Sequence, residues 1–240
     1  MAKSLGWFWG CLIFFLGVSG LKAQEILPPM GVHPLPVSLE QWSDPVESGD
    51  YLLSLTSTPV GALLWSEFPI KLYWDQPLNS DNSAAGKRFD LWARVVQQAV
   101  GEWAVYLPLS SVPAPELADI VVRRSPPPLG SQFNPETGKL EIPPARSAQT
   151  RYEIFWSETI PSVLRHRMTI NISPDLSESL LLSASRHELG HALGIWGHSP
   201  SETDALYFSQ VRNSPPISDR DINTLKKVYQ QPTRLGWPHP

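Results

Sequence analysis

Cysteine and charged residues are both scarce in this chain of 240 residues. Its one cysteine, Cys11, excludes a disulfide scaffold and a zinc site built on cysteines. Charged residues make up 18%, and the net charge of −4 leaves no basic excess, which argues against nucleic-acid binding. Apolar residues, at 42%, and ten tryptophans are plentiful, so the chain is suited to one domain with a sizeable core.

The first 23 residues are typical of a secretory signal peptide. Lys3 and Lys22 enclose 18 uncharged residues, and Ala23 supplies a small residue at a plausible cleavage site. An uncleaved membrane anchor is the alternative, although this stretch is short for a bilayer span. We expect cleavage after Ala23, no stable membrane span thereafter, and a secreted or periplasmic, extracytoplasmic location. Cleavage would remove Cys11 and leave the mature protein without a thiol.

The remaining chain divides into three parts on its composition. Residues 24–60 are rich in proline and are interpreted as an extended lead-in or pro-like segment. Residues 61–232 carry the periodic patterns of a folded domain, and residues 233–240 form a short tail. No internal repeat is present.

Hydrophobic periodicity predicts an α+β domain. Alternation or short apolar runs predict strands at 68–74, 118–122, 139–142, 152–156 and 167–173. Apolar residues at helical spacing predict helices at 88–107, at 178–194 (with Asp175 and Glu178 resembling a helix-start box), and from 218 to about 231. The order of these elements favours a mixed sheet packed against helices.

A metal-binding pattern occupies the second of these helices. His187 and His191 are four residues apart, so both imidazoles project from one face and can reach one zinc ion. Glu188 is rotated by about 100° from His187, which sets its carboxylate beside the metal, where it can take a proton from a zinc-bound water. His-Glu-x-x-His on a helix is therefore a device for amide hydrolysis.

A third ligand is needed, because catalytic zinc usually has three protein ligands and one open position. Gly194 can end the helix and reverse the chain, and Gly197 supplies a second flexible joint, so His198 can return beneath the metal. Asp204 and Glu202 are alternative ligands. We expect Asp204 instead to fix its turn through backbone hydrogen bonds.

Residues 187–199 resemble the zinc site of the metzincin peptidases, in particular the matrixin-like, M10-type branch. That family has the pattern His-Glu-x-x-His-x-x-Gly-x-x-His, often followed by Ser. The resemblance extends over roughly residues 62–232. It implies a zincin-like catalytic domain with a mixed, mostly parallel twisted sheet, a zinc-site helix and a C-terminal helix. It also implies Zn²⁺ held by His187, His191 and His198, with Glu188 as the general base.

Three departures from the family pattern accompany the resemblance. The spacing from Gly194 to His198 is one residue longer than usual, giving an HExxHxxGxxxH variant. Leu206 stands where the family places a methionine in a turn beneath the zinc, and leucine can fill a similar volume. The cysteine that blocks the zinc in many matrixin precursors is missing, because Cys11 lies in the signal segment.

The sequence thus predicts a secreted zinc endopeptidase acting on protein or peptide substrates, with no nucleic-acid partner. Tyr207 and Trp196 are further candidates near the site, the first to stabilise an oxyanion and the second to face a substrate, although packing roles suit both. Two alternatives stay open: a catalytically weak metzincin-like domain that binds proteins or wall polymers, and a zinc amidase acting on cell-wall peptides. Substrate preference and oligomeric state are not predicted.

Overall fold

A five-stranded sheet forms the centre of the computed structural model, which describes residues 26–77, 82–128, 132–135, 137–141, 146–209 and 214–240. The strands are β1 (Ile70–Trp74), β2 (Leu109–Ser111), β3 (Ile120–Arg123), β6 (Ala148–Trp156) and β7 (Leu164–Ile172), in the order β2-β1-β3-β7-β6. Strands β1, β2, β3 and β7 run parallel to one another, whereas β6 pairs antiparallel with β7 and lies at the edge. The predicted α+β class with a mixed, mostly parallel sheet is confirmed.

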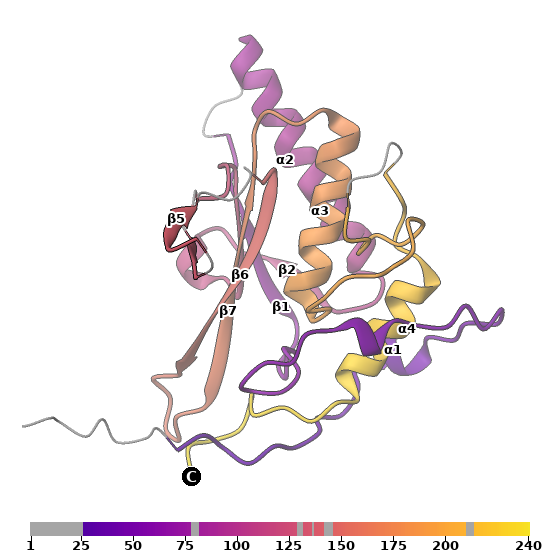
Figure 1. Ribbon diagram of the computed structural model, residues 1–240, viewed down its shortest axis with the longest axis vertical. Coiled ribbons are helices and arrows are strands. Elements are labelled where there is room, and N and C mark those ends of the chain that lie inside the picture. The colour runs from indigo at the N-terminus through magenta and orange to yellow at the C-terminus, as the bar shows by residue number, and fades with distance from the viewer. Residues whose placement is uncertain (1–25, 78–81, 129–131, 136, 142–145, 210–213) are drawn as a thin grey trace, which may run out of the picture.

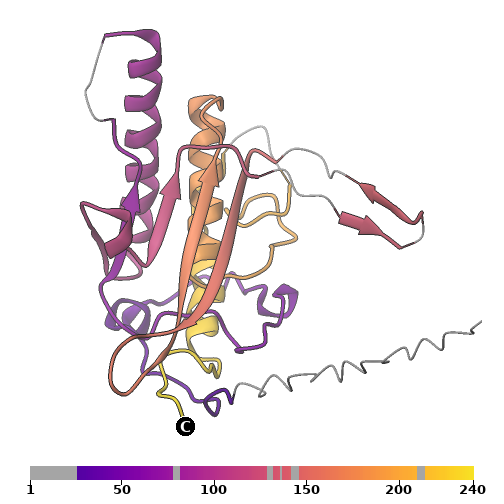
Figure 2. The same cartoon turned by 90° about the vertical axis from the view of Figure 1, so that its left-hand side faces the viewer.

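Two long helices cover one face of this sheet (Figure 1). They are α2 (Ala84–Trp103) and α3 (Glu178–Leu193), and a third, α4 (Asp219–Tyr229), lies near the C-terminal end of α3. Two short elements, β4 (Gln132–Asn134) and β5 (Lys139–Glu141), pair as a hairpin that projects from the body (Figure 2). The small helical turns are α1 (Val37–Gln41), η1 (Leu52–Ser54) and η2 (Pro115–Leu117).

The core lies between the sheet and the helices. Its largest fully buried side chains include Trp92 and Trp103 from α2, Ile70 and Leu72 from β1, and Met168 from β7. The buried positions of β1, β3 and β7 are mainly apolar, so the hydrophobic effect accounts for their packing beneath the helices.

The segments on either side of the predicted domain also pack on it. Thr233 pairs with Gly31 and Gly61 in antiparallel bridges, and Tyr51 and Leu235 are buried in the core. Residues 26–60 therefore pass beneath the domain beside its C-terminal end (Figure 1). The boundaries at residues 60 and 232 stay predictions, and the signal segment with Cys11 lies outside the described residues.

Several element ends differ from the predictions. Helix α2 begins at Ala84, because Ser83 caps it by accepting a hydrogen bond from the Gly86 amide, and it ends before the predicted residue 107. The residue before α3 is Ser177, so the helix-start box at Asp175 was wrong. Strands β6 and β7 are longer than predicted, and His166, expected ahead of a strand, lies inside β7. The C-terminal helix has a complete capping box between Ser218 and Asp221.

Within the described part of the chain, none of the helices combines the length and the apolar character that a bilayer crossing requires.

Candidate metal centre

His187 and His191 lie one turn apart on α3 and point into the same space. Their Nε2 atoms are 3.0 Å apart, and the ring planes are perpendicular. Two imidazole nitrogens bound to one tetrahedral zinc ion would be about 3.3 Å apart, since each zinc–nitrogen bond is about 2.0–2.1 Å. The observed separation is close to this value.

The remaining ring nitrogens fix the chemistry of this pair. Nδ1 of His187 donates to the carbonyl of Ala205 over 2.9 Å, and Nδ1 of His191 donates to that of Ile195 over 2.8 Å. Carbonyl oxygens only accept, so a neutral ring in either position has its proton on Nδ1 and a lone pair on Nε2. Burial lowers the pKa of both side chains to about 4, which keeps them neutral near pH 7. Two lone pairs therefore face each other, an arrangement that suits a shared cation.

His198 completes a group of three. Gly194 ends α3 with φ of 133°, a conformation that glycine adopts readily, and the chain turns back. The ring of His198 then lies 5.2 Å from that of His187 and 4.9 Å from that of His191. One nitrogen from each of the three rings lies within 4.8 Å of the other two. The extra residue between Gly194 and His198 therefore does not keep His198 from the pair.

The N-terminal segment supports the loop that carries His198. The Thr56 amide donates to the Trp196 carbonyl over 2.8 Å, and Leu55 forms a bridge with Gly197. A Cβ atom on Gly197 would lie 2.7 Å from Leu55 Cα and 2.8 Å from the Ser54 carbonyl oxygen. The longer loop is thus packed against backbone from residues 54–56, and only glycine fits at position 197.

Glu188 lies beside the histidines and is 7% exposed. The hydroxyl of Thr150 in β6 donates to Glu188 Oε2 over 2.6 Å, and the Thr150 hydroxyl oxygen also lies 3.0 Å from the backbone carbonyl oxygen of Glu188. Burial raises the pKa of Glu188, and the neighbouring His187 and Thr150 oppose this shift. A carboxyl group whose pKa is raised by burial takes up a proton more readily than a free one, which suits a general base.

Contacts from α2 and from the C-terminal part of the chain hold α3 in place. Arg186 forms two hydrogen bonds with Glu102 of α2, and Trp103 Nε1 donates to the Arg186 carbonyl over 3.0 Å. Gly190 faces the next turn of chain, where a Cβ would lie 2.5 Å from Leu206 Cδ2. Leu206 is fully buried and fills the space beside the helix.

Asp204 is buried in a polar network instead of facing the histidines. Its carboxylate accepts hydrogen bonds from the side chains of Ser199, Ser218 and Arg220. The alternative metal-ligand role for Asp204 therefore finds no support. We expected Asp204 to fix its turn through backbone hydrogen bonds. The donors to its carboxylate are side chains instead. Glu202, the other alternative ligand, is exposed and is not part of the histidine group.

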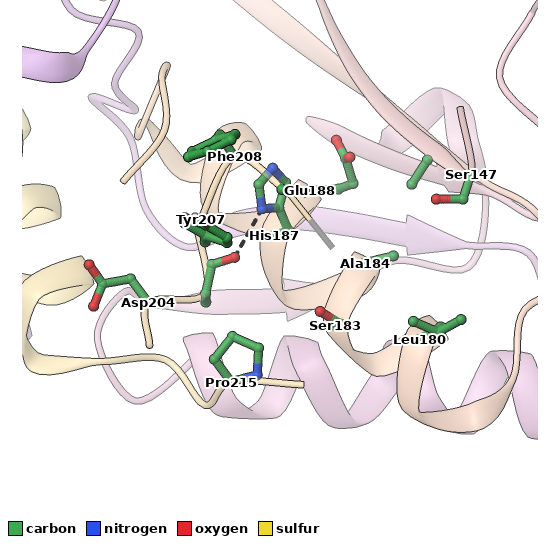
Figure 3. Close-up of a pocket in the computed structure, with 13 residues that line it drawn as sticks. Ser147, Leu180, Ser183, Ala184, His187, Glu188, Asp204, Tyr207, Phe208 and Pro215 are labelled. Atoms are coloured by element: carbon green, nitrogen blue, oxygen red, sulfur yellow. Dashed lines mark hydrogen bonds between the residues drawn. The ribbon is translucent and has the colours of Figure 1, made fainter. Parts of the chain in front are cut away.

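A cleft of about 890 Å³ opens in front of the three histidines. Besides the histidines and Glu188, its walls include Ala148, Gln149 and Thr150 from the edge strand β6, and Trp196 and Phe208 from the loops. A smaller adjoining recess of about 140 Å³ lies beside His187, with Leu180 and Ala184 from α3 and with Tyr207, Phe208 and Pro215 in its wall (Figure 3). Tyr207 thus lines this recess, and Trp196 packs against His191 and Tyr152 while also facing the cleft.

Sequence analysis did not identify Thr150, Arg186 or Glu102 as part of the site. Thr150 comes from a strand whose predicted start was residue 152, and no local pattern marks a threonine as a partner of a distant carboxylate. Arg186 directly precedes His187, but its partner Glu102 is 84 residues away. A helix-spacing argument could have placed Arg186 on another face of α3, but not its contact with α2.

Comparison with known proteins adds no independent identification: no protein-family model matches the chain, and no curated protein matches its sequence significantly.

Proposed function

We propose that this protein is an exported zinc-dependent endopeptidase of metzincin type. His187, His191 and His198 would hold the zinc ion, and Glu188 would act as the general base. The observation that carries this proposal is the pair of Nε2 atoms, 3.0 Å apart, on rings whose Nδ1 atoms both face carbonyl oxygens, beside a third imidazole and a buried carboxylate. Ordinary buried histidines would pair a nitrogen lone pair with a donor, not with another lone pair.

The donor set fits zinc. Imidazole nitrogens are suitable ligands for zinc, and a set of three protein ligands is typical of catalytic sites with one position left open. The carbonyls of Ala205 and Ile195, which fix the ring orientation of two ligands, are the kind of outer partner that metal-bound histidines have.

The catalytic step depends on where protons move. A bound zinc ion would polarise the substrate carbonyl and make a water molecule acidic enough to attack it. Glu188 accepts the proton of the attacking water and then donates it to the leaving amine nitrogen. Thr150 orients the carboxylate through Oε2, so that the other oxygen, Oε1, is available to the cleft.

Strand β6 provides a means of holding a peptide. It lies at the edge of the sheet and contributes Ala148 to Thr150 to the cleft. The unpaired backbone groups of an edge strand can bind an extended chain by β-augmentation. The recess beside His187 is large enough for a small apolar side chain of such a peptide.

The first experiment is metal analysis of the purified chain combined with peptide cleavage. We expect about one zinc ion per chain and cleavage that a chelator abolishes and added zinc restores. A double variant, His187→Ala with His191→Ala, should lose both properties. Zinc content that is unchanged in this variant, or a wild-type chain that takes up no zinc, would contradict the proposed function.

A further inference from the structure

We infer that Arg146 selects substrates carrying an acidic side chain two to four residues after the scissile bond. This inference rests on the proposed function, since it names the substrate class of the same cleft. Arg146 lies at the mouth of the cleft, two residues before the start of β6, and its side chain is exposed.

Arg146 is the cation among the described residues that line this cleft, and within that part of the chain it has no ion-pair partner. Among the described lining residues, Arg146 is the one arginine or lysine, and Glu188 is the one carboxylic acid. Arg146 forms no ion pair with any residue that the structure describes. The four residues before it in the sequence, 142–145, contain no charged side chain. In a protein with a net charge of −4, an unpaired arginine beside a binding cleft is a site for an anionic group of the ligand.

Arg146 lines the same cleft as the reacting groups. Its side chain is part of the wall that also includes His198, Glu188 and the edge-strand residues Ala148 to Thr150. A peptide held in front of the histidines therefore passes beside Arg146.

The direction of the substrate follows from the edge strand. Antiparallel pairing is the more common and slightly more stable mode for an added strand. Thr150 marks the position of Glu188 along β6. A peptide running antiparallel to β6 from that point extends its C-terminal part towards Ala148 and then Arg146. Four residues of extended chain span about 13 Å, and the long arginine side chain shortens the distance that the peptide must cover.

The chemistry favours a carboxylate. The guanidinium group has a planar set of donors that can bind both oxygens of an aspartate or glutamate side chain. Glu188, the other ionisable acid or base of the cleft besides the histidines, lies next to them. An acidic substrate residue near Arg146 is therefore closer to Arg146 than to Glu188, so attraction to the arginine outweighs repulsion from the glutamate.

The test uses peptide pairs that differ only in charge. Glutamate and glutamine are compared at each of the second, third and fourth positions after a bond that the zinc-loaded chain cleaves. We expect kcat/KM to be about three- to tenfold higher for one or more of the glutamate peptides, with the ratio falling as salt concentration rises. Arg146→Gln should bring the ratio close to one, and Arg146→Lys should give an intermediate ratio because it keeps the charge but not the planar donors. In the Arg146→Glu variant, kcat/KM should instead be higher for a peptide with lysine at that position than for one with glutamate.

Binding separates this inference from the proposed function. The affinities of the same peptides are measured with the zinc-loaded Glu188→Gln chain and with its Arg146→Gln derivative. This binding arm needs no known cleavage site, because glutamate can replace glutamine at successive positions of any peptide that binds. A preference for glutamate that depends on Arg146 therefore supports the inference even if the wild type cleaves nothing. Equal affinities for glutamate and glutamine peptides, or a preference that survives in Arg146→Gln, would overturn it while leaving the zinc site untouched.

Discussion

The hydroxyl of Thr150 donates a hydrogen bond to Glu188 Oε2 over 2.6 Å, joining the edge strand β6 to helix α3. Both residues are buried, so water competes poorly for this contact. The bond stabilises the ionised carboxylate and opposes the rise in the pKa of Glu188 that burial causes. Thr150 is therefore a positioning residue for the proposed general base.

Replacing Thr150 with valine tests this relationship. The nearly isosteric change removes the hydroxyl, so the pKa of Glu188 rises further and the base is protonated at higher pH. A hydrogen bond to a charged group is worth about 1.5–3 kcal/mol, so the acidic limb of the kcat/KM–pH profile should move up by about one to two pH units. Zinc content should not change. An unshifted acidic limb would contradict the role given to Thr150.

Gly197 provides a second prediction, on the third ligand. In Gly197→Ala, the new methyl group would overlap backbone atoms of residues 54 and 55, which displaces the loop carrying His198. Zinc affinity should fall about tenfold or more, as measured by competition with a chelator. Gly101→Ala is the matched control, because a Cβ there meets nothing within 4 Å and alanine stabilises a helix by about 1 kcal/mol relative to glycine. Equal zinc affinities in both variants would remove His198 from the ligand set.

Leu206 provides a third prediction, on the packing against α3. Leu206→Met conserves volume in a fully buried position and should change the free energy of unfolding by less than about 1.5 kcal/mol. Leu206→Ala should cost about 2–5 kcal/mol, because it leaves a cavity beside Gly190. Chemical denaturation measures both. Should Leu206→Met raise activity by orders of magnitude at unchanged stability, the sulfur would have a role that packing does not explain.

His166 predicts a specific acid sensitivity. Its ring stacks on Trp65 at 3.8 Å, and complete burial lowers its pKa to about 3. The folded protein therefore keeps this ring neutral, whereas the unfolded chain takes up a proton near pH 6.5. Stability should fall as pH decreases from about 6.5 towards 3, with this one group contributing up to about 1.4 kcal/mol per pH unit.

The variant His166→Phe preserves a ring against Trp65 but cannot be protonated. Urea unfolding between pH 4.5 and 7 should show a smaller loss of stability on acidification than in the wild type. The other buried histidines are common to both proteins, so the difference isolates His166. Parallel stability–pH curves for the two proteins would show that His166 is already accessible to protons in the folded state.

Local patterns in the sequence were sufficient for α3, α4 and the histidine spacing. The apolar stripe and the capping box at Ser218 depend on residues within a few positions of one another. The contact between Ser83 and Gly86 is equally local, but the first turn of α2 carries no large apolar side chain, so periodicity placed the start of the helix too late.

Contacts between distant segments could not be predicted from local sequence patterns. Tyr51 donates to Asp221 across 170 residues, and Thr56 supports the loop of His198 from a segment interpreted as an extended lead-in. Proline-rich composition correctly indicates little regular structure, but it does not reveal whether such a segment packs against a core. The partners of Glu188 and His198 therefore emerge only from the folded chain.

The central claim, that Glu188 is the base of a zinc peptidase, is tested most directly by comparing the wild type with Glu188→Gln on one peptide mixture. Both proteins are loaded with zinc, and their metal content and melting temperatures are measured first. Our account predicts equal zinc content and a loss of about 10²–10⁴-fold in the cleavage rate of the variant. Equal rates and identical cleavage products for the two proteins would contradict it.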